Sequence, residues 1–156
     1  MAAPDSRLYY RQLESYIREE ILPKPRYENY QVILTGHSLG GGVAAIVGAR
    51  LQALAVTFSS PGVVLSRRKF GVTLREISQY VVNIKPEGDL VPLVDVQGVK
   101  AQSIVCSANR LKYSCHSILS TIAEIEGTCQ QGRAWREYWG GEGGGQGREG
   151  DGDGAL

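Results

Sequence analysis

One serine lies where a nucleophile could be activated. Ser38 is flanked by Gly36 and Gly40 in a G-x-S-x-G pattern, after an apolar run at residues 31–35 and before a stretch of small residues. In a sharp turn from strand to helix, flanking glycines remove Cβ atoms that would collide, and the serine Oγ projects over the carboxyl end of the sheet. The pattern therefore predicts a nucleophile elbow, with the backbone N–H of Leu39 as an oxyanion donor.

Such a serine needs a base that removes its proton. The chain has 2 histidines, His37 and His116. His37 is adjacent to Ser38, and adjacent side chains diverge on a turn of this kind, so we expect His37 to support the elbow as a structural neighbour. His116 is then the predicted base.

The base in turn needs a carboxylate that orients it. Three candidates follow an expected strand: Glu87, Asp89 and Asp95. Asp89 is favoured because it closely follows the strand end and because Pro92 restricts its loop. The predicted order of Ser38, Asp89 and His116 along the chain is that of α/β-hydrolases, and it differs from the orders in chymotrypsin and subtilisin.

Other site types fit the sequence poorly. A phosphate loop requires G-x-x-x-x-G-K-[ST], which is absent, and the relaxed dinucleotide pattern at Gly40, Gly42 and Ala45 lacks the acidic residue expected about 20 positions later. The 3 cysteines form no C-x-x-C pair, so we expect no metal site. The net charge of +1 gives no sign of a nucleic-acid partner. No cofactor is expected.

The elements that would position these residues alternate between strands and helices. Helices are predicted at 8–21, 39–54 and 116–126, strands at 31–35, 55–58 and 80–85, a further strand at 101–106, and a loop at 90–99. This alternation predicts an α/β fold in which a mostly parallel sheet is flanked by helices.

The composition divides the chain into two parts. With 42% hydrophobic and 21% charged residues, the chain is typical of one globular domain, but its 20 glycines are concentrated near the end. We expect a folded domain at 1–139 and a disordered, glycine-rich acidic tail at 140–156. Neither a signal peptide nor a transmembrane segment is evident in this chain, so its location cannot be read from the sequence.

Four segments together resemble a known family: 35–41 around the elbow, 55–62, 89–92, and Cys115 with His116. They are similar to the class 3, fungal lipase-like lipases of the α/β-hydrolase superfamily, and among these to the vacuolar lipases that degrade autophagic bodies. The resemblance covers residues 9–127. It implies a partial α/β-hydrolase fold and a serine esterase or lipase acting on acylglycerols or phospholipids. It also suggests transient contact with a membrane or lipid droplet, in a secretory or vacuolar lumen.

The resemblance also has a departure. Members of the family carry further strands, a second oxyanion donor and a lid before the helix that begins this chain. We therefore expect a part of a longer lipase, with weak or no activity alone. A catalytically inactive hydrolase-like binding module is the alternative, and an acyltransferase or thioesterase would use the same residues.

The cysteines leave two states open. Cys106 and Cys115 are nine residues apart, and a disulfide between them would fix the segment that leads into His116. Two reduced thiols are the other state that the sequence allows.

Overall fold

Four parallel strands form one sheet in the order β1-β2-β3-β4. The computed structural model describes residues 9–107 and 114–129. Its strands are β1 (Leu34–His37), β2 (Ala55–Phe58), β3 (Val81–Pro86) and β4 (Ala101–Ile104). The predicted α/β class with a parallel sheet is confirmed. The predicted tail at 140–156 lies outside the described residues, so the division into 1–139 and 140–156 stays a prediction.

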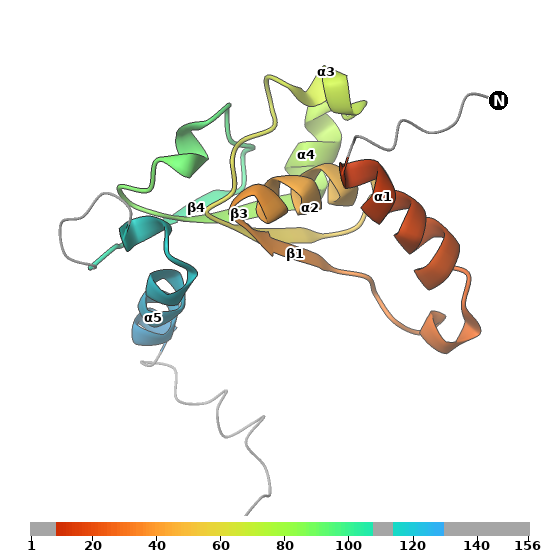
Figure 1. The fold of residues 1–156 in the computed structure, drawn as a ribbon, viewed down its shortest axis with the longest axis horizontal. Coiled ribbons are helices and arrows are strands. Elements are labelled where there is room, and N and C mark those ends of the chain that lie inside the picture. The colour runs from red at the N-terminus through yellow and green to blue at the C-terminus, as the bar shows by residue number, and fades with distance from the viewer. Residues whose placement is uncertain (1–8, 108–113, 130–156) are drawn as a thin grey trace, which may run out of the picture.

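Helices flank the sheet on both sides. They are α1 (Tyr9–Tyr16), which continues as a π-helical turn (Ile17–Ile21), α2 (Ser38–Leu51), α3 (Arg67–Phe70), α4 (Leu74–Tyr80) and α5 (Ile118–Cys129). Short 3₁₀ turns occur at Pro25–Tyr27, Val91–Leu93 and Ser114–His116. Helices α1, α2 and α4 lie on one side of the sheet, and α5 lies on the other (Figure 1).

Strand β1 and helices α3 and α4 differ from the sequence expectations, which placed no helix at Arg67–Phe70. The strand predicted at 31–35 begins only at Leu34, whose N–H bonds to the carbonyl of Leu54 at the entrance to β2. Helix α4 was not predicted, although the Thr73 and Glu76 pair at its start carries a recognisable signal. Their side chains and backbone N–H groups bond reciprocally as a capping box, which the Thr-x-x-Glu spacing favours.

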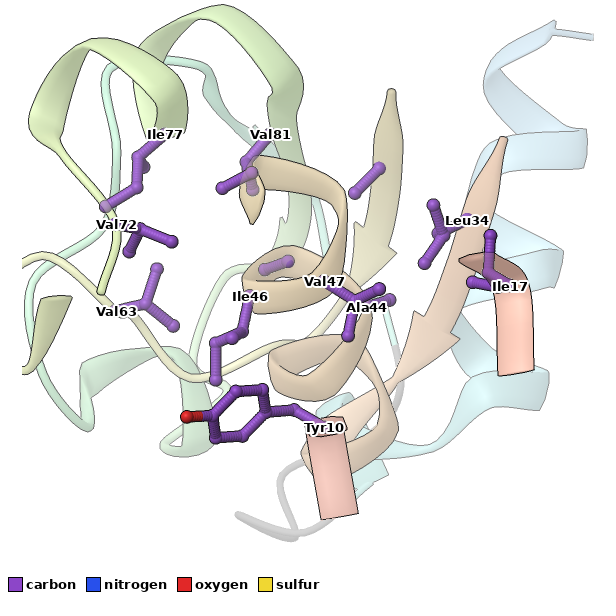
Figure 2. Close-up of a cluster of buried hydrophobic side chains, with 13 residues drawn as sticks. Tyr10, Ile17, Leu34, Ala44, Ile46, Val47, Val63, Val72, Ile77 and Val81 are labelled. Atoms are coloured by element: carbon purple, nitrogen blue, oxygen red, sulfur yellow. The ribbon is translucent and has the colours of Figure 1, made fainter. Parts of the chain in front are cut away.

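The apolar core lies between α2 and the sheet (Figure 2). Val47 and Ala49 of α2 are fully buried, as is Ala55 of β2. The other elements add Tyr10 and Ile17 from α1 and its continuation, Leu34 from β1, Ile77 from α4 and Val81 from β3. This packing holds α2, and with it the first residue of the helix, at a constant position over the strand ends.

A partly buried ion pair attaches α1 to the rest of the fold. The Glu14 carboxylate accepts hydrogen bonds from Arg50 Nε at 2.6 Å and from Arg18 Nε at 3.1 Å, and Arg50 also donates to the Phe70 carbonyl at 2.6 Å. Burial alone would raise the pKa of Glu14. The hydrogen bonds and positive charges of the two arginines outweigh that effect and hold its pKa below the usual value.

Replacing this carboxylate should weaken the fold in a pH-dependent way. Glu14→Gln should lower the free energy of unfolding by about 1–3 kcal/mol at pH 7, because bonds to a charged acceptor are lost. Since the folded pKa is lowered, the advantage of Glu14 is complete above the unfolded pKa and disappears as the pH falls through the folded pKa. Urea unfolding at pH 7 and below pH 4 would measure it. A difference that grows toward acid pH would contradict this account.

Candidate active site

The chain turns sharply between β1 and α2, and Ser38 occupies the turn. His37 has an extended backbone with φ −114° and ψ 145°, and Ser38 then adopts a left-handed φ of 57° before the helix continues. A non-glycine residue in this region is strained by roughly 1–2 kcal/mol. The predicted elbow requires such a strained residue, because the left-handed backbone turns the serine side chain away from both β1 and α2.

The glycines around the turn do not contribute equally. A Cβ on Gly36 would lie 2.4 Å from the Gly40 carbonyl oxygen, and one on Gly41 would lie 2.9 Å from the Ser60 Cβ. A Cβ on Gly40 would meet nothing within 4 Å among the described residues. The prediction that a Cβ atom at Gly40 would collide with its surroundings is therefore wrong. The close contact of strand and helix falls on Gly36 and Gly41.

Three side chains from distant parts of the chain meet at this turn. His116 Nε2 lies 2.9 Å from Ser38 Oγ, and His116 Nδ1 lies 3.0 Å and 3.1 Å from the two carboxylate oxygens of Asp89. A carboxylate only accepts, so Nδ1 carries a proton and, in the neutral ring, Nε2 is free to accept the serine O–H. The arrangement allows a proton to pass from the serine to the imidazole.

Of the three candidate carboxylates, the structure brings Asp89 to His116. Its side chain is fully buried, and Oδ1 also accepts a bond from the Val91 N–H. Glu87 is exposed. Asp95 instead binds the 65–66 segment, through the hydroxyl and N–H of Ser66 and the N–H of Leu65.

The environment of Asp95 explains why it is a structural group. Burial would raise the pKa of Asp95, but four hydrogen bonds, led by the Ser66 hydroxyl, hold its pKa below the usual range. Asp95 therefore stays ionised and joins two loops. The sequence held no signal for this contact, because its partners lie about 30 residues away.

A disulfide lies directly before His116. Cys106 and Cys115 are joined, with their Cα atoms 5.7 Å apart, so the 3₁₀ turn at Ser114–His116 is linked to the chain that leaves β4. Of the two states that the sequence left open, the structure contains the crosslinked one. The crosslink restricts the position of the residue that carries the imidazole.

Leu39 occupies the first turn of α2, where backbone N–H groups have no acceptor within the helix. Its side chain is 72% exposed and borders a cavity of about 430 Å³ on the α1 side of the turn. The cavity is lined mainly by apolar side chains, including Tyr10, Val43, Ile46, Phe70 and Val94. These residues come from four separate segments, so sequence reasoning missed the cavity.

The described residues contain neither a candidate metal cluster nor a membrane-spanning helix. Within 9–107 and 114–129, no group of three or more His, Cys, Asp or Glu residues is placed to hold a metal ion. No helix in these ranges has the length and apolar character needed to cross a bilayer.

Comparison with known proteins identifies the family. The family described as lipase (class 3) matches residues 7–98, which include Ser38 and Asp89. The chain belongs to the class 3 lipases. His116 lies beyond the matched range, so the comparison leaves its role to the geometry of the site.

Relatives of this class 3 lipase chain are similar over short lengths. It is 44% identical over 48 residues to a protein named as a lipase, ATG15, from two strains of Cryptococcus neoformans var. neoformans serotype D. The match covers 31% of this chain and 9% of that protein. The crystal structure of Lip2 lipase from Yarrowia lipolytica matches with a TM-score of 0.33 and 21% identity, over 74% of this chain and 48% of that chain.

The elbow can be tested through its two glycines. Gly36→Ala should lower the free energy of unfolding by about 1–3 kcal/mol, because the new methyl group must displace backbone. Gly40→Ala should leave stability unchanged or raise it by up to about 1 kcal/mol, because the site is open and alanine favours a helix. Urea denaturation of both variants measures the difference. Equal losses would show that the close contact does not lie at Gly36.

Proposed function

We propose that this chain carries the nucleophile, base and acid of a serine carboxylic ester hydrolase. Ser38 is the nucleophile, His116 the base and Asp89 its partner. The observation that carries the proposal is the continuous hydrogen-bonded path from the Asp89 carboxylate through both His116 ring nitrogens to Ser38 Oγ. Membership of the class 3 lipases supports the same reaction.

The proposed reaction forms an acyl-enzyme. His116 Nε2 takes the Ser38 proton while Oγ attacks the ester carbonyl carbon, and the carbonyl electron pair moves onto oxygen. The Leu39 N–H donates to this oxyanion. As the tetrahedral intermediate collapses, the C–O bond of the ester breaks, and the His116 N–H protonates the departing alcohol. In the second half of the reaction, His116 takes a proton from water while the water oxygen attacks the acyl carbon. The bond from the acyl carbon to Ser38 Oγ then breaks, His116 returns the proton to Oγ, and the carboxylic acid is released.

Asp89 acts on the charge of the base. Proton uptake makes His116 an imidazolium, which the buried carboxylate stabilises from 3.0 Å. The same bond keeps the proton on Nδ1 before the reaction, so that Nε2 faces Ser38 as an acceptor. One contact therefore selects the reactive tautomer and favours the charged intermediate.

The surroundings of the site favour lipid esters. The apolar cavity beside Leu39 is suited to an acyl chain, and side chains at its rim or next to it are exposed, with Leu65 at 69% and Val94 at 61%. We propose acylglycerols or phospholipids as substrates, reached by transient contact with a membrane or lipid-droplet surface.

We propose that this chain corresponds to part of a longer lipase. The part of the chain that matches the two relatives covers 9% of their length. Leu39 is the one oxyanion donor that we assign in this chain, and losing one such donor costs on the order of 10²–10³ in turnover. We therefore expect low turnover from the isolated chain.

The nucleophile can be tested without efficient turnover. A fluorophosphonate probe should label the chain at Ser38, and Ser38→Ala should abolish labelling, because the hydroxyl that bonds to His116 is removed. Ser103→Ala, at an exposed serine on β4, should label like the wild type. Mass spectrometry of the labelled peptide measures the outcome. A chain that folds but does not label would support an inactive binding module instead.

The acid can be tested by its charge. Asp89→Asn should slow labelling by about 10³–10⁴, because an amide can donate to Nδ1 and so stabilise the wrong tautomer of His116. Glu87→Gln, an exposed carboxylate two residues earlier, should stay within about twofold of the wild type. Both rates come from a time course of probe incorporation. A similar loss in the two variants would remove Asp89 from its proposed role.

A further inference from the structure

His37 is a partly buried side chain that the proposed reaction leaves without a role. It is the last residue of β1 and directly precedes Ser38. Its Nε2 lies 2.8 Å from the backbone carbonyl oxygen of His116, 79 positions away in sequence. Because a carbonyl oxygen only accepts, Nε2 must carry a proton and donate it to this bond. The side chain next to the nucleophile therefore binds the backbone of the base.

The two imidazole rings also contact each other. Their centroids lie 4.8 Å apart, with an angle of 35° between the ring planes. Asp89 and Ser38 already hold the two ring nitrogens of His116. The ring of His37 adds a contact to the side of the imidazole ring, which supplements these bonds and the backbone bond.

The backbone bond complements the disulfide. The disulfide secures Cys115 to the chain leaving β4, whereas the His37 bond secures His116 to the end of β1. Ser38 is the next residue after His37 in the chain. The bond from His37 therefore fixes the position of His116 relative to Ser38. A displacement of about 1 Å in such a site can cost about a hundredfold in rate.

We propose that His37 is a positioning residue for the base. Its Nε2–H bond to the His116 carbonyl makes the main contribution and its ring contact a smaller one, and together they hold the His116 imidazole within hydrogen-bond distance of Ser38. This inference rests on the proposed function, because it takes His116 as the base for Ser38. It goes beyond the expectation that His37 supports the elbow.

Two substitutions separate the donor from the ring. His37→Phe keeps a flat ring but removes the donor, and His37→Gln places an amide N–H close to the position of Nε2 without a ring. We expect fluorophosphonate labelling of Ser38 to slow by about tenfold to a hundredfold in His37→Phe and to stay within about threefold in His37→Gln. With p-nitrophenyl butyrate, kcat should fall in His37→Phe while KM stays unchanged.

A spectroscopic measurement keeps the test independent of activity. Proton NMR detects the low-field Nδ1–H of His116 in its bond to Asp89. We expect this resonance in the wild type and in His37→Gln, and its loss or broadening in His37→Phe. The midpoint temperature of thermal unfolding of each variant should lie within a few degrees of that of the wild type. If His37→Phe does not fold, His37→Leu serves as the second variant without a donor.

The outcomes distinguish this inference from the proposed reaction. If the wild type does not label but the resonance is lost in His37→Phe and kept in His37→Gln, the proposed reaction is wrong, whereas His37 still positions the His116 ring. If His37→Phe labels at the wild-type rate or keeps the resonance, the positioning role is overturned. Equal losses in the Phe and Gln variants overturn it as well, because restoring the donor would then have no effect.

Discussion

The close approach of α2 to β1 is the constraint on which the site depends. The carbonyl of Gly40 lies where a side chain on Gly36 would be, so the helix begins almost on top of the strand. This proximity leaves no room for a gradual turn, and Ser38 takes a left-handed backbone conformation at the junction. The buried apolar residues of α2 hold the helix against the sheet and offset the strain. Core packing and the conformation of Ser38 are therefore parts of one arrangement.

Parallel strands explain why three distant residues share one edge. Ser38 follows β1, Asp89 follows β3 and His116 follows β4, and the carboxyl ends of parallel strands lie on the same side of a sheet. The strands need only correct register to bring these loops together. Local contacts then fix each side chain within its loop. The Val91 N–H bonds to the Asp89 carboxylate, and the disulfide fixes the residue before His116.

Burial gives the Asp89 carboxylate its influence. A fully buried carboxylate is unfavourable unless hydrogen-bond donors surround it, and both oxygens of Asp89 face the same imidazole N–H. Water competes little for that contact, so the carboxylate has a strong effect on the tautomer of His116. The His116 side chain is 27% exposed, and its other nitrogen lies 2.9 Å from Ser38 Oγ. Burial is therefore complete at the Asp89 carboxylate and partial at His116 and Ser38.

Local sequence determined the parts of this protein that depend on neighbouring residues. The G-x-S-x-G pattern, the alternation of strands and helices and the order of Ser38, Asp89 and His116 could be read because each rests on short-range sterics or on the parallel topology. Only the tertiary structure decided whether Cys106 and Cys115 are joined, which glycine bears the close contact and where His37 binds. Those outcomes depend on loop conformations and on contacts between residues up to 79 positions apart, which no local pattern encodes.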